Sequence, residues 1–486
     1  MNDALHGGAG RRRPRRPTVA QRRGRLALLA VALLVVVVVI VSALGGGSLP
    51  QPPRPGAAQG AAAGNPFAYV PAREPEFIAR AIAGEAHPLF VMSPDGAIAT
   101  AARVAPFRPL IDRVTAGTGI DPNLVEALVF VESAGRPDVI AGTDPADAVG
   151  LTQILAQTGQ SLLGMHIDLA QSRRLTAAIS AAALAGHTRR AEALLRRREA
   201  IDTRFDPAQE LAATVRYLKL AEGQFGREDL AIESYHMGIG NLHQVLDDYD
   251  GGQAVPYAQL YFDTAPDHRG TAYSLLAGFG DDSSLYYWRV LGAVGIMHLY
   301  RTDRSALARL ASLQSASASN ADVLHPPDRT PAFSDPSALA DAYQRHTLVP
   351  LPANAAALGL EFNPGMGSEA SKLGGTPALY RGLRPVALRL LIALAARVRS
   401  LSGGAEPLRV DSTVSDARYQ QQTGDGFAPA TNGYSFTISR RYVSRAQAIA
   451  FQAVLDRLQA LNLIAWTREA AVIDVTVASD AASWLR

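Results

Sequence analysis

The sequence predicts a mainly helical domain, preceded by a single transmembrane helix and followed by a smaller domain of mixed helices and strands. Three observations lead to this fold class. An uncharged run covers residues 26–44, Ala- and Leu-rich segments with helix-capping residues cover about 77–311, and short alternating polar and apolar runs appear only in the last 150 residues. With 486 residues, the chain is long enough for two or three packed domains.

The first 75 residues predict a basic tail, a membrane-spanning helix and a spacer. Residues 1–25 contain eight Arg and one Asp, which places the N-terminus in the cytoplasm by the positive-inside rule. The 19 uncharged residues of 26–44 are enough to cross a hydrocarbon core of about 30 Å. A cleaved signal peptide is the alternative, because residues 41–43 form a small-residue cleavage site. Residues 45–75, rich in Pro, Gly and Ala, predict a flexible spacer, and we expect everything after it to lie outside the cytoplasm.

Charge and cysteine content exclude several classes of function. The formal net charge is +3, and because the tail alone carries about +7, the rest of the chain sums to about −4. That balance argues against a nucleic-acid partner. Cysteine is absent, which excludes disulfides and thiolate metal sites. We expect no metal and no cofactor.

The remaining chain divides into two predicted domains. Residues 76–311 form the helical domain, residues 312–336 are polar and predict a linker, and residues 337–486 form the α+β domain. The segment DPAQELAATVRYLKLAEGQFG (206–226) is typical of the helical part, with Asp and Pro at its start and Gly just after its end.

The stretch DPNLVEALVFVESAGRP contains the best candidate for an acid catalyst. Asp121 and Pro122 predict the start of a helix that is apolar nearly all round and therefore buried, and Gly135 and Pro137 predict its end. Glu132 then lies in the last turn, where burial and the negative end of the helix dipole both disfavour its charged form. Both effects predict a raised pKa, as a general acid near neutral pH requires. The alternative is a glutamate that reaches solvent where the helix emerges.

A second segment, DAVGLTQILAQTG (147–159), predicts a turn that leads into a helix. Gly150 allows a close backbone approach at this turn. Gln153 offers both a donor and an acceptor to a sugar amide or hydroxyl. By itself, this segment is equally consistent with an ordinary loop.

A third segment, LAIESYHMGIGNL (230–242), predicts a helix that ends in a glycine loop. Tyr235 precedes Gly238 and Gly240, and we expect the loop to expose the tyrosine hydroxyl. A simple capped helix is the alternative for this pattern as well.

In this order, the three segments resemble the SLT-type lytic transglycosylases, a lysozyme-like family that acts on peptidoglycan. Glu132-Ser133 resembles the family's acidic helix end, and Gly150 to Ile154 resembles Gly-Leu-Met-Gln-Ile, with Thr in place of Met. The segment SYHMGIG resembles Ala-Tyr-Asn-Ala-Gly-x-Gly, with His in place of Asn, and FDPAQELAATVRYL and YYWRVL resemble two further helices. The resemblance covers about residues 107–300. It implies Glu132 as the catalytic residue and a substrate-binding set of Ser133, Gly150, Leu151, Gln153, Tyr235, His236 and Gly238.

The mechanism implied by the resemblance uses a single carboxyl group. Glu132 protonates the glycosidic oxygen between N-acetylmuramic acid and N-acetylglucosamine, and the substrate's acetamido group stabilises the positive centre. The ionised Glu132 then takes a proton from the muramic hydroxymethyl, which closes a 1,6-anhydro ring. A lysozyme-like muramidase instead needs a second carboxylate, for which Asp138, Asp144 and Asp147 are candidates, although Asp is also common in such turns. A non-enzymatic peptidoglycan-binding scaffold is the remaining alternative.

The sequence departs from the family pattern at two places. His236 places a titratable group beside the cleft, unless it is only a structural hydrogen-bonding residue. Residues 165–204 form an insert that contains HTRRAEALLRRREA, with five Arg on one helix. This helix predicts either a solvated face or a basic wall that meets peptide-stem carboxylates.

The C-terminal segments weakly resemble the zinc DD-carboxypeptidase fold. Around Gly433, the positions of the family's zinc-binding His and Asp hold Ala430 and Thr437, and the last His of the chain is His346. A His-based zinc site is therefore excluded. The resemblance implies a non-catalytic accessory domain, with either a binding role or a purely structural one.

Overall fold

The computed structural model describes residues 65–280, 283–315, 320–424 and 426–485. The predicted tail (1–25) and transmembrane helix (26–44) lie outside these residues, as does most of the spacer. Within the described ranges, no helix is both long enough and apolar enough to cross a membrane. From residue 65 on, the described chain belongs to one compact unit.

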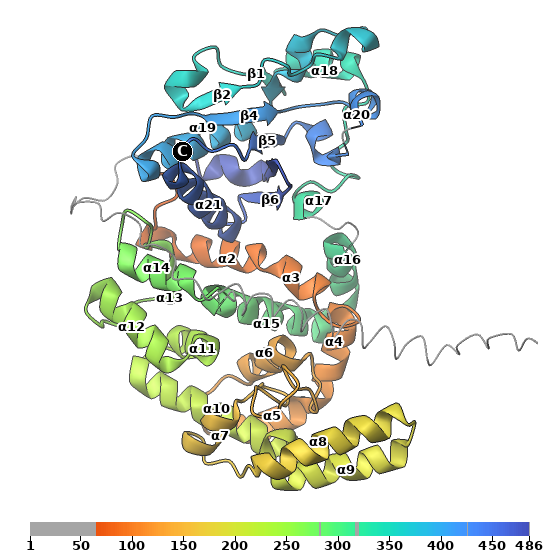
Figure 1. Cartoon of the computed structure of the whole chain (residues 1–486), viewed down its shortest axis with the longest axis vertical. Helices are drawn as coiled ribbons and strands as arrows, with labels where there is room; N and C mark the ends of the chain where they lie inside the picture. The colour runs from red at the N-terminus through yellow and green to blue at the C-terminus, as the bar shows by residue number, and fades with distance from the viewer. Residues whose placement is uncertain (1–64, 281–282, 316–319, 425, 486) are drawn as a thin grey trace, which may run out of the picture. The chain divides into compact units, whose positions relative to one another are not determined.

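Residues 65–315 are mostly helical, as predicted (Figure 1). Two of the predicted N-caps are present, because Asp121 accepts a hydrogen bond from the Asn123 N–H and Asp206 accepts two from the start of its helix. The helices are α2 (Glu74–Gly84), α3 (Ala86–Val91), α4 (Ala97–Val104), α5 (Arg108–Thr115), α6 (Pro122–Ser133), α7 (Ala156–Ser161), α8 (Leu169–Leu184), α9 (Thr188–Ile201), α10 (Pro207–Phe225), α11 (Glu228–Met237), α12 (Ile239–Asp250), α13 (Tyr257–Phe262), α14 (Gly270–Gly278), α15 (Tyr286–Thr302) and α16 (Arg304–Ser315).

Helix α15 is the central packing element of this part. It lies against α6, α2, α11, α3 and α4, and the Trp288 side chain at its start is fully buried. Its partner α6 is buried as predicted, because every residue from Leu124 to Phe130 has little or no exposed surface. This packing sets the position of the C-terminal end of α6.

The C-terminal part contains a five-stranded sheet of order β2-β4-β5-β7-β6. Strands β2 and β4 are parallel and the other pairs are antiparallel, and helices α19 and α21 pack against each other and against this sheet. The elements are α17 (Asn320–Leu324), α18 (Pro336–Gln344), β1 (Val349–Pro350), β2 (Leu360–Phe362), β3 (Gly382–Leu383), α19 (Pro385–Ser402), β4 (Leu408–Ser412), α20 (Ala417–Thr423), β5 (Ser435–Ser439), α21 (Arg445–Ala460), β6 (Ile464–Arg468) and β7 (Val472–Val477). The α+β character of this region and its three expected strands are confirmed.

Two expectations about this part are wrong in detail. The alternation of apolar and polar residues over 434–439 predicts a half-buried strand. In the structure the polar residues of β5 are buried as well, and Thr437 donates a hydrogen bond of 2.7 Å to Asp474 on β7. The segment 312–336 is not a plain linker, because α16 continues to Ser315 and α17 packs against β6 and β7. The domain boundaries themselves stay predictions.

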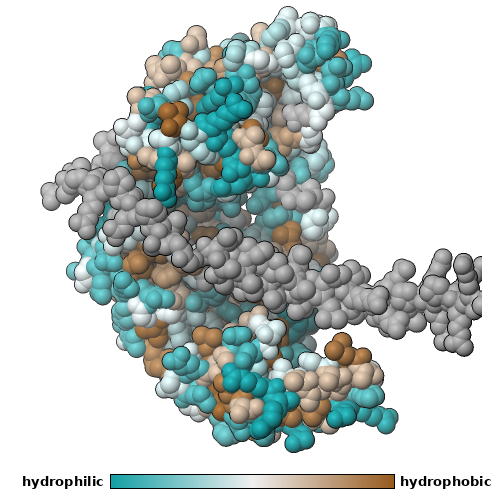
Figure 2. All heavy atoms as spheres, in the orientation of Figure 1, coloured by the Kyte–Doolittle hydropathy of each residue, from teal (hydrophilic) through white to brown (hydrophobic). Residues whose placement is uncertain are grey.

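The helical part and the sheet part share one hydrophobic core. Polar contacts also connect them: Arg397 on α19 forms a two-bond ion pair with Asp267, and Arg457 on α21 donates to the backbone carbonyls of Tyr261 and Thr264. On the face shown in Figure 2, hydrophilic and apolar residues are intermixed over both parts.

Candidate active site

Helix α6 carries Glu132 in its last turn, as the sequence predicts. The helix ends one residue earlier than expected, since Ala134 already adopts a left-handed conformation with φ 55°. The N–H groups of Ala134 and Gly135 donate back to Phe130 and Val129, a pairing typical of a Schellman end. Gly135 is required for another reason: a Cβ at this position would lie 2.8 Å from the backbone of Arg103 on α4.

The carboxyl group of Glu132 has the environment expected of a general acid. Burial raises its pKa to about 7, whereas the Tyr286 hydroxyl, which donates a hydrogen bond of 2.5 Å to Oε1, pulls the pKa in the opposite direction. Tyr286 is the first residue of α15, so the helix that packs along α6 also supplies the partner of its acid. The residue as a whole is of intermediate exposure, although its carboxyl group is buried.

The ring of Tyr286, which donates this hydrogen bond, is stacked on an imidazole ring. The ring of His236 stacks on the ring of Tyr286 with centroids 5.0 Å apart, and His236 Nδ1 lies 2.8 Å from Ser283 Oγ. His236 is exposed at the end of α11. It therefore both contacts the partner of Glu132 and acts as the structural hydrogen-bonding residue considered above.

The Gly150–Gln153 turn is held by a buried carboxyl group. Glu210 on α10 accepts hydrogen bonds from the N–H groups of Leu151 (2.6 Å) and Thr152 (2.9 Å) and from the Thr152 hydroxyl. Burial raises the pKa of Glu210 to about 8, against the effect of these three donors. Gly150 has φ 86°, and a Cβ there would overlap the Glu210 carboxylate and the carbonyl of Arg204. The close approach expected at Gly150 is thus confirmed, and the group that approaches its backbone is the Glu210 carboxylate of the protein itself.

Tyr235 connects this turn to α11 rather than displaying its hydroxyl from a loop. The hydroxyl donates to the Thr152 carbonyl at 2.8 Å, and the ring packs edge-to-face on Tyr217. The expected glycine loop is wrong, because Gly238 alone, with φ 88°, joins α11 to α12 and Gly240 lies inside α12. Burial raises the pKa of Tyr235, with a further contribution from nearby Glu132. Tyr235 therefore lies near the acid and holds the turn at Thr152, and its contact with substrate stays a prediction.

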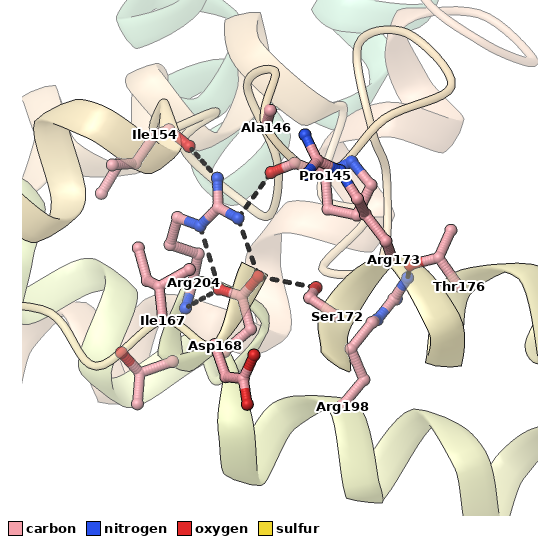
Figure 3. A network of polar contacts seen from close by, with 12 residues as sticks. Pro145, Ala146, Ile154, Ile167, Asp168, Ser172, Arg173, Thr176, Arg198 and Arg204 are labelled. Carbon is pink, nitrogen blue, oxygen red and sulfur yellow. Dashed lines mark hydrogen bonds and ion pairs between the residues drawn. The ribbon is translucent and has the colours of Figure 1, made fainter. Parts of the chain in front are cut away.

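The outer part of the same loop is fixed by Arg204, which is completely buried (Figure 3). Its guanidinium donates to three backbone carbonyls, those of Pro145 (2.6 Å), Asp147 (3.2 Å) and Ile154 (3.1 Å). Its other two donors reach the Asp202 carboxylate at 2.9 and 2.7 Å. All five guanidinium N–H donors are therefore used inside the protein.

Residues 109–186 match the family model of the Transglycosylase SLT domain. This part of the chain is an SLT-type, lysozyme-like domain. The matched range contains Glu132 and the turn at Gly150–Gln153, whereas α10, α11 and α15 follow it. No curated protein matches the chain. An SLT-type domain supports an activity of the lytic-transglycosylase type on peptidoglycan.

The structure places the expected substrate-binding residues in different surroundings. Gln153 adopts φ 54°, and its side-chain amide donates to the Gly150 carbonyl, so its contact with a ligand stays a prediction. Ser133 and Leu151 have 1% and 0% exposed surface, and the Ser133 hydroxyl donates to Val129. Both side chains therefore pack inside the protein, and their contact with substrate stays a prediction.

Three functional candidates of the SLT-type site were missed from the sequence: Tyr286, Glu210 and Arg204. Tyr286 and Glu210 lie within segments recognised as family-like helices, but no local signal indicates which side chain faces the acid. For Arg204 the sequence does contain a local signal, because an acidic residue, Asp202, stands two positions before it at the end of the insert. In the structure these two residues form a buried ion pair.

The candidate second carboxylates do not contact Glu132 in the described chain. Asp144 forms a two-bond ion pair with Arg173, which lowers its pKa, and Asp138 and Asp147 are exposed. In the C-terminal part, Ala430 is buried and Thr437 is hydrogen-bonded to Asp474. Among the residues described, no group of three acidic or histidine side chains is placed to hold a metal ion.

Proposed function

We propose that this protein is a peptidoglycan lytic transglycosylase, in which Glu132 acts first as general acid and then as general base. One observation carries the proposal: the carboxyl group has a pKa of about 7 and, among the described residues, accepts a hydrogen bond from Tyr286. At neutral pH a large fraction of Glu132 is protonated and can give its proton to the glycosidic oxygen. Burial alone raises this pKa, against the lowering effect of Tyr286, and no carboxylate among the described residues contributes to the shift.

Tyr286 supports the second half of the reaction. When Glu132 has given up its proton, the tyrosine hydroxyl donates to the carboxylate and stabilises its charge. The substrate's acetamido group takes the place of the second carboxylate that paired glycosidases use. The ionised Glu132 then removes the proton of the muramic hydroxymethyl group, whose oxygen closes the 1,6-anhydro ring.

Product analysis tests this assignment directly. The full chain and its Glu132→Gln variant are incubated with purified sacculi, and the products are identified by mass. We expect 1,6-anhydro-muramic ends from the unchanged chain only. Reducing ends would instead identify a muramidase, and binding without products from either protein would identify a scaffold.

We also propose that residues 26–44 anchor the protein in the cell membrane as a single pass, with residues 1–25 in the cytoplasm and the rest outside. The support is the uncharged 19-residue run and the arginine cluster before it. Mass analysis of the N-terminus of membrane-extracted protein tests this. An intact N-terminus in the membrane fraction is expected, and a chain that begins after residues 41–43 would show cleavage.

A further inference from the structure

Helix α9 presents one face made of four arginines, which we call the arginine face. At about 100° per residue, the four fall within an arc of about 120° and span about 12 Å along the helix. The opposite side of α9 packs on α8, and Ala191 and Arg198 are buried there. The arginine face consists of Arg189, Arg190, Arg196 and Arg197, all of which are exposed.

The arginine face is not neutralised by the described chain. None of its four guanidinium groups has an acidic oxygen within 4.0 Å among these residues, whereas Arg173 on α8 pairs with Asp144. Glu192 and Glu199 lie along one edge of the face, two turns apart, and neither forms an ion pair with it within that distance. Four like charges this close repel each other, so an anionic ligand with several charges gains by binding across them.

The hairpin of α8 and α9 is attached firmly to the loop beside Glu132. At its base, Asp202 accepts from Ser172 on α8 and from Arg204, which in turn holds the loop carbonyls (Figure 3). Arg173 adds two bonds to Asp144 in the same loop. A ligand on the arginine face therefore has a fixed position relative to the acid.

We propose that the arginine face binds the carboxylates of the peptide stems that the glycan strand carries, while the strand itself occupies the site at Glu132. This rests on the proposed function. A glycan strand with its stems attached has its negative charge in the stems, because the muramic carboxyl is held in an amide bond. Arginine forks are suited to carboxylates, with which they form paired hydrogen bonds.

An anionic membrane surface fits the hairpin less well. A helix that lies in the membrane interface needs a wide free apolar face, and the apolar side of α9 is already packed on α8. Leu184 at the end of α8 is the large exposed hydrophobic residue of the hairpin, with 77% of its surface exposed. In the corresponding part of Figure 2, hydrophilic residues lie beside apolar ones, some of them strongly apolar.

The test measures binding, with turnover removed. The full chain carrying Glu132→Gln is sedimented with native sacculi and with sacculi whose stem carboxylates have been converted to neutral amides. The test variant adds Arg→Gln at all four positions of the arginine face. A matched variant makes the same charge change at four exposed arginines of the accessory domain and its approach: Arg329, Arg418, Arg441 and Arg445.

We expect the arginine-face variant to bind native sacculi roughly tenfold more weakly at low salt, the combined effect of four exposed charge contacts. It should no longer distinguish native from amidated sacculi, whereas the matched variant should do so like the parent. Unchanged binding to native sacculi would overturn the proposal. An equal loss of binding on both kinds of sacculi would overturn it as well. Sedimentation with vesicles that contain anionic lipid completes the test, and a loss of binding seen only with these vesicles would also overturn the proposal.

The same experiment separates this inference from the proposed function. Sedimentation of the Glu132→Gln chain does not depend on cleavage, and cleavage by the chain with Glu132 is measured separately. Arginine-dependent binding without any cleavage products would overturn the transglycosylase assignment and keep the stem-binding face. Cleavage without arginine-dependent binding would do the reverse.

Discussion

Replacing Glu132 by Gln should make the protein more stable at alkaline pH and leave its stability nearly unchanged at acidic pH. The pKa of Glu132 is about 7 in the folded chain, against 4.5 for an ordinary glutamate. Because the folded pKa is raised, the stability of the unchanged chain is fully present below pH 4.5 and declines as the pH rises to about 7. A shift of this size corresponds to about 3 kcal/mol. Glutamine cannot ionise, and it keeps an oxygen that accepts from Tyr286, so its variant avoids this loss.

Denaturant unfolding of both proteins at about pH 4.5 and about pH 8 measures the effect. The variant should gain about 3 kcal/mol over the unchanged chain at the higher pH and less than about 0.5 kcal/mol at the lower one. The same substitution at Glu222, exposed on α10, is the control, and its carboxyl group stays in water in both states. A gain for Glu132→Gln that is equal at both pH values would refute the reasoning, because it would show that the buried charge is not the cause.

Three further substitutions probe the surroundings of the acid. Tyr286→Phe removes a donor to the Glu132 carboxylate worth about 1.5–3 kcal/mol, so the alkaline limb of the pH–rate profile should move up by roughly 1–2 pH units; an unmoved limb would contradict the assignment. Gly150→Ala places a Cβ on the Glu210 carboxylate and should lower stability by at least ~1–3 kcal/mol, seen as a fall in the unfolding midpoint; a variant of unchanged stability and activity would contradict the contact. Glu210→Gln turns one acceptor into a donor facing the N–H groups of the loop and should cost about 1–3 kcal/mol together with turnover; retention of both would show that the loop does not depend on this carboxyl group.

What the sequence could predict depends on the distance over which each signal acts. Helix α6, its Asp121 cap and the burial of Glu132 follow from a single continuous stretch, and the structure has all three. The partner of Glu132 is 154 residues away on α15, and that pairing depends on how two helices pack. Similarly, the alternation in β5 correctly indicates a strand and places Phe436 and Ile438 in the core.

The alternation of residues in a strand also does not indicate whether other elements cover its polar face. The polar residues of β5 looked solvent-exposed because they alternate with apolar ones, but Ser435 and Thr437 are bonded to β7 and buried. The same limit applies to Tyr235, whose hydroxyl was expected to be exposed and instead donates to the Thr152 carbonyl. In both cases, a polar side chain was satisfied by a distant part of the chain.

The contacts of Arg204 determine which changes its loop can accept. The guanidinium reaches main-chain carbonyls at positions 145, 147 and 154, and these oxygens are present whatever side chains stand there. Point substitutions on the exposed parts of the loop can therefore accumulate without releasing it. An inserted or deleted residue displaces all three oxygens at once. Related sequences should accordingly differ in the residues of this segment but not in its length.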